Sequence, residues 1–131
     1  EAGKKRGIPR ECDRDGRERG WRVMSDYLRV TPAESRIDGL FCENDVLAFG
    51  AMQAIRDYDA SLQVGIVGFD DVEEARTTTW NLTTWAQRSD LQIAEALNRL
   101  LLAQPDEQGP WRFGELRLRQ SHLNPALFSV Q

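Results

Sequence analysis

Apolar side chains recur at three- and four-residue intervals in three stretches of the chain. This spacing predicts three amphipathic helices, which we place at residues 17–29, 45–57 and 88–103. The third helix has the widest apolar face, made of Leu91, Ile93, Ala94, Leu97, Leu100 and Leu101. Such a stripe is typical of a helix that packs one side against a hydrophobic core.

Short apolar runs separate these helices and predict four strands. We place them at residues 37–42, 62–67, 82–86 and 115–119, with a short helix or loop over 71–79. The second run is rich in β-branched residues, whereas the last alternates apolar and charged residues as an edge strand does. Helices and strands therefore alternate along the chain, as in proteins built from βαβ units. This order predicts an α/β fold of three layers, in which helices cover both faces of a mostly parallel sheet.

Length and composition indicate one soluble domain. The 131 residues suffice for one hydrophobic core, and 40% hydrophobic with 29% charged residues is the balance of a globular protein. We expect a loop or poorly ordered segment over 1–16, a folded region over 17–121 and a tail over 122–131. No apolar run approaches the roughly 18 residues of a membrane span, so we predict a cytoplasmic protein without a membrane partner. The net charge of -4 argues against DNA binding by these residues themselves.

The few residues with reactive side chains form no catalytic or metal-binding motif. Cys12 and Cys42 match no metal or redox spacing, and Cys42 lies in an apolar strand, where a buried and reduced thiol is expected. His122 is the only histidine and has no nucleophile motif around it, so we expect it on the surface. We therefore predict no enzymatic activity, no cofactor and no metal site.

Polar side chains follow the first two predicted strands: Asn44 and Asp45 after the first, Asp70 and Asp71 after the second. Parallel α/β sheets bind ligands at the carboxyl ends of their strands, so Asn44 and Asp70 should point into one crevice. An amide both donates and accepts hydrogen bonds, and a carboxylate accepts them from hydroxyl groups, a combination that suits a polyol. Alternatively, Asn44 and Asp70 are only helix caps. Asp45 and Asp71 occupy first-turn positions, where a negative charge stabilises a helix.

Three segments carry motifs in a specific order and spacing: Phe41-Cys-Glu-Asn-Asp-Val-Leu-Ala-Phe-Gly-Ala-Met-Gln-Ala-Ile55, Val64-Gly-Ile-Val-Gly-Phe-Asp-Asp71 and Leu82-Thr-Thr-Trp-Ala-Gln87. Together they resemble three successive motifs of the lactose-repressor (LacI/GalR) family of bacterial transcription regulators. The last predicted strand, ending in Leu118-Arg-Gln-Ser121, is similar to the last strand of that family's effector domain. The resemblance covers residues 17–121.

The resemblance implies the C-terminal lobe of a two-lobed, periplasmic-binding-protein-like effector domain, incomplete at its N-terminus. In this family a small molecule, usually a sugar or a nucleoside, binds between two lobes and changes the DNA affinity of a separate N-terminal helix-turn-helix, for which these residues carry no motif. The resemblance implies ligand contacts at Asn44, Asp70 and Gln87, and a homodimer. The family's dimerisation surface corresponds to Phe49, Gly50, Met52, Glu74, Thr77 and Thr78. Alternatively, Phe49 simply packs onto the sheet.

The chain departs from the family pattern at several places, one of which concerns the ligand. Trp80-Asn81 stands where the family has Pro-Pro, and Asp13-Arg-Asp-Gly16 stands where the family often carries an apolar side chain near the ligand. The effector therefore stays open, with a sugar or related polyol as the first expectation. We expect Trp21 and Trp85 in the core, and Trp80 and Trp111 in loops.

Two other classes of protein fit the predicted fold. A periplasmic sugar-binding protein of an ABC transporter has the same architecture, and it would carry a signal peptide upstream where a regulator would carry a helix-turn-helix. An enzyme built on a parallel sheet is the third interpretation, although no catalytic motif supports it.

Overall fold

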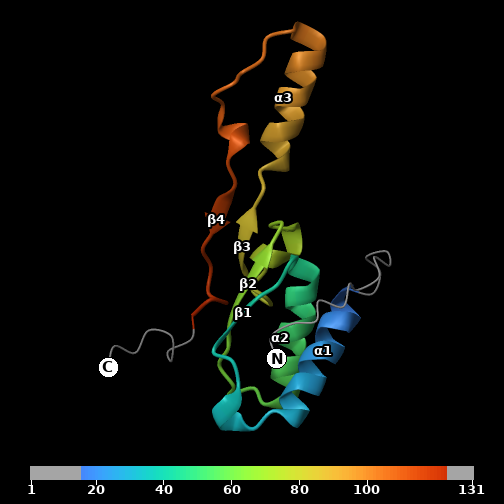
Figure 1. Cartoon of the computed structure of the whole chain (residues 1–131), viewed down its shortest axis with the longest axis vertical. Coiled ribbons are helices and arrows are strands. Elements are labelled where there is room, and N and C mark those ends of the chain that lie inside the picture. The colour runs from blue at the N-terminus through green and yellow to red at the C-terminus, as the bar shows by residue number, and fades with distance from the viewer. Residues whose placement is uncertain (1–15, 124–131) are drawn as a thin grey trace, which may run out of the picture.

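A computed structural model of the chain describes residues 16–123, in which helices and strands alternate (Figure 1). The helices are α1 (Gly16–Val30), α2 (Asp45–Tyr58) and α3 (Ser89–Leu102), and the strands are β1 (Gly39–Phe41), β2 (Gly65–Phe69), β3 (Thr83–Ala86) and β4 (Glu115–Arg117). Three short 3-10 helices complete the order: η2 (Ala33–Ser35), η3 (Glu73–Arg76) and η4 (Pro110–Arg112). The predicted loop over 1–16, apart from its last residue, and the predicted tail beyond 123 lie outside the described residues.

The four strands form one sheet in the order β1-β2-β3-β4. β1 runs parallel to β2 and β2 parallel to β3, whereas β4 is antiparallel to β3. In this register Val67 pairs with Thr83, and Thr84 pairs with Arg117. The predicted α/β class with a mostly parallel sheet is confirmed. Because β1, β2 and β3 are parallel, the turns that follow them lie at the same edge of the sheet.

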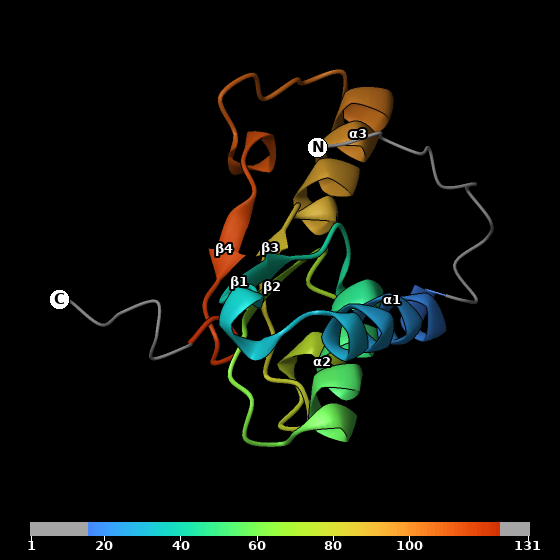
Figure 2. The same cartoon turned by 60° about the horizontal axis from the view of Figure 1, so that its bottom comes forward.

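α1 and α2 pack against each other on one side of the sheet (Figure 2). Their backbones meet at two glycines. A Cβ atom on Gly50 would lie 2.0 Å from the carbonyl oxygen of Arg17, and one on Gly20 would lie 2.3 Å from that of Leu47. Glycine in a helix interior costs about 1 kcal/mol relative to alanine, and here its missing side chain allows the close contact between the helices.

The core lies between this helix pair and the sheet, with Leu28, Phe49 and Leu82 almost fully buried. The ring of Phe49 stacks on that of Trp80, with 5.1 Å between centroids. Trp80 is therefore buried, at 7% exposure, although it follows a loop. The expectation that Trp21 and Trp85 form the core was wrong, since both are 39% exposed, and Trp21 Nε1 donates a hydrogen bond to Asp57 Oδ2 at 2.8 Å.

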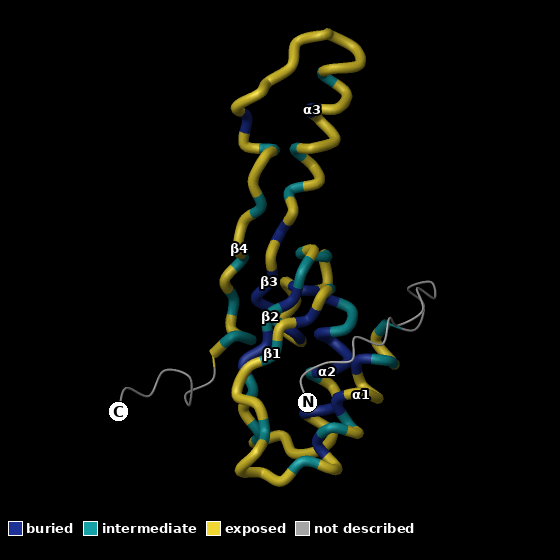
Figure 3. The backbone as a smooth tube through the Cα atoms, in the orientation of Figure 1, coloured by how far each residue is buried: buried dark blue, intermediate teal, exposed yellow. Residues whose placement is uncertain are grey.

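α3 forms where its apolar periodicity predicts it, but it extends past the ends of the strands, with η4 beside it (Figures 1 and 3). Its apolar stripe is exposed, at 62% for Ile93 and 80% for Leu100, and its one buried residue is Glu95. The expectation that helices cover both faces of the sheet therefore differs from the structure. Periodicity sets the face of a helix, whereas the partner that covers this face is decided by tertiary contacts.

No helix within residues 16–123 combines the length and the apolar character needed to cross a membrane.

We predict that Gly50→Ala destabilises the protein by about 3 kcal/mol, because the new methyl group would overlap the backbone of α1. Urea denaturation followed by circular dichroism measures the loss. Gln53→Ala, at an exposed position on the same helix, should change the free energy of unfolding by less than about 0.5 kcal/mol. Equal denaturation midpoints for Gly50→Ala and the parent chain would show that the two helices do not meet at this glycine.

Candidate functional site

The turn after β2 has an unusual backbone. Asp70 has a φ of 117° and Asp71 a φ of 54°, and positive φ is uncommon for residues other than glycine. The backbone N–H of Asp70 donates to the carbonyl oxygen of Trp85 at 2.8 Å, which keeps the turn beside β3. Strained backbone of this kind gathers at functional sites, where the surrounding structure holds it in place.

Two of the three predicted ligand residues lie in contact at this turn. Gln87, just after β3, donates a hydrogen bond from Nε2 to Asp70 Oδ1 at 2.8 Å. Both side chains are exposed to solvent. The parallel register of β2 and β3 therefore brings together an acceptor carboxylate and an amide from two separate motifs. A ligand contact at these residues stays a prediction.

Asn44, the third predicted ligand residue, caps α2. Its Oδ1 accepts a hydrogen bond from the backbone N–H of Leu47 at 2.8 Å, in the geometry of an N-cap. The helix-cap interpretation of Asn44 is thus confirmed. Its side chain is half-buried and is not among the residues that line the cavity beside Asp70. A ligand contact through its amide nitrogen stays a prediction.

A cavity of about 300 Å³ opens beside Asp70 at the start of α3. Its lining is mostly charged and contains no aromatic ring: Asp70, Asp71, Arg76, Ala86, Arg88, Ser89, Asp90 and Arg117. The arginines of this lining were not among the predicted site residues. The sequence gives little indication that they belong to a site. Arg88 lies next to Gln87 but in no motif of its own, and Arg117 is one of the charged residues of an ordinary alternating strand.

Asp45 is fully buried, and its carboxylate joins three segments of the chain. Oδ1 accepts a hydrogen bond from the hydroxyl group of Thr84 at 2.5 Å, and Oδ2 accepts one from the backbone N–H of Val72 at 2.9 Å. A Cβ atom on Gly68 would lie 2.3 Å from Asp45 Oδ1, so this contact needs the glycine. Burial raises the pKa of Asp45; the two hydrogen bonds oppose that shift, and the nearby charges of Asp70 and Asp71 add to it. Asp45 has the expected structural role and also bridges α2 to the sheet.

Asp71 is held by arginine rather than left free for a ligand. Arg119 Nη2 donates to Asp71 Oδ1 at 2.7 Å, and Nη1 of the same guanidinium donates to the carbonyl oxygen of Leu82 at 2.7 Å. This side chain ties the turn after β2 to the segment that follows β4. The expectation of a structural role for Asp71 agrees with this contact.

The residues predicted for a dimer surface fall into two groups. Phe49 is 0% exposed and Gly50 is buried against α1, so neither lies on an open surface of this chain as a dimer contact requires. α1 covers this side of α2, and Phe49 is packed in the core, as the alternative has it, with its ring stacked on Trp80. Met52 is half-buried, whereas the last three residues are exposed: Glu74, Thr77 and Thr78. Their part in dimer formation stays a prediction.

His122 is half-buried rather than on the open surface. Its Nδ1 lies 2.6 Å from the hydroxyl oxygen of Thr83, which also accepts a hydrogen bond from the backbone N–H of Arg119 at 2.8 Å. This contact attaches the chain after β4 to β3. Within residues 16–123 no group of three or more His, Cys, Asp or Glu side chains is arranged to hold a metal ion.

The fold and the site define a lobe of the α/β class, with polar groups and a cavity at the carboxyl ends of parallel strands. The family model of the periplasmic binding protein-like domain matches residues 2–121, so the chain belongs to this family.

Known relatives are transcription regulators. The chain is 34% identical over 86 residues to the HTH-type transcriptional repressor PurR of Escherichia fergusonii, and this match covers 64% of the chain and 24% of that protein. It is 31% identical to PurR of Actinobacillus pleuropneumoniae over the same length. The chain thus spans about a quarter of the length of these relatives.

Solved structures agree on the fold. A LacI family transcriptional regulator from Lactobacillus casei with bound glucose has a TM-score of 0.66 at 26% identity, covering 80% of the chain and 39% of that protein. A dimeric Lac repressor has a TM-score of 0.65 at 24% identity, covering 82% of the chain and 40% of the repressor. The predicted resemblance to the effector-binding domain of LacI/GalR regulators is therefore confirmed.

We predict that Asp45→Ala lowers the free energy of unfolding by about 2–3 kcal/mol, because the Thr84 hydroxyl and the Val72 N–H both lose their acceptor. Urea denaturation measures the effect, with Asp26→Ala on the exposed face of α1 as the control. A change no larger than that of the control would refute the bridging role.

The same carboxylate predicts a pH dependence with a definite sign. Since the pKa of Asp45 is raised in the folded state, the folded chain binds this proton more tightly than the unfolded chain. Stability relative to Asp45→Asn should therefore fall as the pH rises from about 4, the ordinary value for aspartate, through the raised pKa. Denaturation of both variants across this range tests the sign, and a relative gain in stability with rising pH would contradict it.

Cys42 provides a chemical test of its burial. Burial, and then the negative charge of Asp45, raise the pKa of the Cys42 thiol to about 11. Because the thiolate is the reactive form, we expect alkylation by iodoacetamide at pH 8 to be at least about 100-fold slower in the folded protein than in urea. A Cys12→Ser background isolates the reaction of Cys42. Similar rates in the two states would show that the thiol is not buried.

Proposed function

We propose that this chain is the effector-binding and dimerising part of a LacI/GalR-type transcription regulator, which senses a small polar ligand between two lobes. The observation that carries the proposal is the contact between Asp70 and Gln87, at the ends of two adjacent parallel strands and beside a polar cavity. Similarity to PurR and to LacI family regulators supports the regulatory role.

In the proposed site Asp70 accepts hydrogen bonds from hydroxyl groups of the ligand, and Gln87 donates and accepts beside it. The amide nitrogen of Asn44 adds a donor from the turn after β1. A sugar or related polyol is the first candidate, and the glucose in the Lactobacillus casei regulator is consistent with this class. Ligand binding shifts the population between two lobe arrangements and so changes DNA affinity through a helix-turn-helix outside these residues.

The exposed stripe of α3 supports a second lobe in the working protein. Five leucine or isoleucine side chains of this helix are at least half exposed, which is unusual for a folded domain: Ile93, Leu97, Leu100, Leu101 and Leu102. A second lobe packed on α3 would cover this stripe and form the other wall of the ligand site. The Asp70 cavity lies at the first turn of the same helix, so movement of that lobe would reach the ligand directly.

A homodimer is the proposed assembly. Met52 on α2 and the exposed residues Glu74, Thr77 and Thr78 remain the candidate contacts. Phe49 and Gly50 contribute to this surface only indirectly, because they hold α2 against α1 and Trp80. The similar Lac repressor structure is dimeric, which supports this assembly.

The proposed regulator is not an enzyme, needs no cofactor and acts in the cytoplasm, where its DNA lies. A periplasmic sugar-binding protein of a transporter is the second candidate, since the same family of domains serves both roles. The encoded sequence upstream of Glu1 separates the two: a helix-turn-helix supports the regulator, and a signal peptide followed directly by a first lobe refutes it.

We predict that Asp70→Ala weakens effector binding by about 100-fold in the complete protein, because the ligand loses its charged acceptor. Isothermal titration calorimetry with a panel of monosaccharides, sugar acids, sugar phosphates and nucleosides first identifies a bound ligand and then measures the variant. Asp26→Ala, an exposed carboxylate on α1, is the matched control. Unchanged affinity in Asp70→Ala would refute the site assignment.

A further inference from the structure

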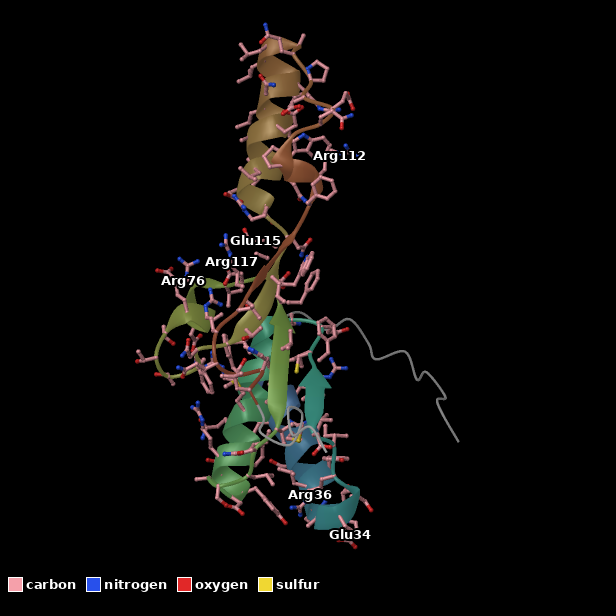
Figure 4. The ribbon with its side chains drawn as sticks, turned by 90° about the vertical axis from the view of Figure 1, so that its left-hand side faces the viewer. Glu34, Arg36, Arg76, Arg112, Glu115 and Arg117 are labelled. Atoms are coloured by element: carbon pink, nitrogen blue, oxygen red, sulfur yellow. The ribbon has the colours of Figure 1, made fainter. Side chains whose placement is uncertain are left out.

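Two arginine side chains of the Asp70 cavity have no strong partner of their own. Arg76, the last residue of η3, and Arg117 on β4 both line the cavity. Figure 4 shows them gathered with Glu115 in one region of the molecule, with Arg112 next to that region beside α3 and Arg36 at the other end of the molecule. The side chain of Arg76 is 61% exposed and that of Arg117 is 39% exposed. Both guanidinium groups are therefore within reach of a bound molecule.

The distances show how weakly these two groups are engaged. Arg76 Nη2 lies 3.8 Å from Asp71 Oδ2, and Arg117 Nε lies 3.7 Å from the same oxygen. Both separations exceed the length of a hydrogen bond. Arg117 Nη2 also lies 3.3 Å from Glu115 Oε2. Each guanidinium carries five N–H donors, so most of their donor capacity remains for other acceptors.

The carboxylates they approach are already bound by better-placed arginines. Arg119 donates to Asp71 at 2.7 Å, and Arg88 donates to Glu115 at 3.1 Å. Arg88 additionally pairs with Asp90 at 3.5 Å. With Asp70 counted, four guanidinium groups and four carboxylates balance in this cluster, so what is left over is hydrogen-bond donors on Arg76 and Arg117 rather than net charge. The remaining carboxylate of the cavity, Asp70, is hydrogen-bonded to Gln87 instead.

The first turn of α3 adds backbone N–H donors at the same cavity, beside the carboxylate of Asp90. The helix has 14 residues and begins at Ser89, which lines the cavity, and its N-cap Arg88 makes no side-chain capping hydrogen bond. The N-terminus of a helix carries a partial positive charge from its unpaired N–H groups. Guanidinium donors and this helix end therefore face one small volume that also holds an acceptor carboxylate.

From this arrangement we propose that the effector carries an anionic oxygen group, a carboxylate or a phosphate, which Arg76 and Arg117 bind. Planar guanidinium groups suit such groups because two parallel N–H donors match two acceptor oxygens. Asp70 and Gln87 receive the hydroxyl-bearing part of the same molecule. The inference rests on the proposed function, in which a small polar ligand occupies this cavity, and it narrows the ligand class from neutral sugars to sugar acids and sugar phosphates.

The test measures the complete protein by calorimetry against four probes at one ionic strength: glucose, glucuronate, glucose 6-phosphate and inorganic phosphate. We expect at least one anionic sugar to bind about 10-fold or more tightly than glucose. Tighter binding of glucuronate would indicate carboxylate recognition, and tighter binding of glucose 6-phosphate would indicate phosphate recognition. Arg76→Gln and Arg117→Gln should each weaken that binding about 10-fold, with glucose binding little changed. Arg112→Gln, on η4 and outside the cavity lining, should have no effect.

Circular dichroism of each variant confirms that it is folded, and Arg117→Lys should retain part of the affinity because it keeps the charge. The proposal is overturned if glucose binds as tightly as the anionic sugars, if neither anionic sugar binds, or if both glutamine variants bind anions like the parent protein. The proposed function fails separately, if no neutral or anionic ligand depends on Asp70.

Discussion

The buried carboxylate of Asp45 is the contact on which the edge of the sheet that carries Asp70 and Gln87 depends. It accepts hydrogen bonds from Thr84 on β3 and from the backbone after β2, while its own backbone begins α2. A fully buried carboxylate is costly unless donors surround it, and here the donors come from segments distant in sequence. This single group therefore holds the ends of β2 and β3 at a fixed distance from the start of α2.

The exposed site follows from this buried bridge. The backbone N–H of Val72 donates to Asp45, and the carboxylate of Asp71 accepts a hydrogen bond from Arg119. These two contacts fix the turn after β2, in which Asp70 keeps a positive φ beside Gln87. The polar residues of the sequence motifs can therefore be divided by their contacts. Each polar residue that follows a strand has either a structural partner inside the lobe or an exposed side chain at its edge, and Asp70 and Gln87 belong to the second kind.

α3 divides the chain into a packed part and an extended part. α1, α2 and the sheet share one core, whereas α3 contacts η4 and keeps its leucines in solvent. Glu95 takes the place of an apolar contact there, accepting hydrogen bonds from Arg99 and from the backbone of Asp106. The cavity beside Asp70 lies at the junction of the two parts, at the first turn of α3.

The sequence by itself determined the features that depend on neighbours along the chain. Periodicity placed α2 and α3 within one or two residues of their observed bounds, and the alternation of elements defined a mostly parallel sheet. It also marked Asn44, Asp70 and Gln87 as strand-end residues, since the order of strands fixes that edge. Tertiary structure alone decided the rest: the burial of Phe49 under α1, the exposure of the α3 stripe, and the meeting of Arg76 and Arg117 beside Asp70. The physical reason is that burial and charge balance depend on which distant segments pack together, and no local pattern carries that information.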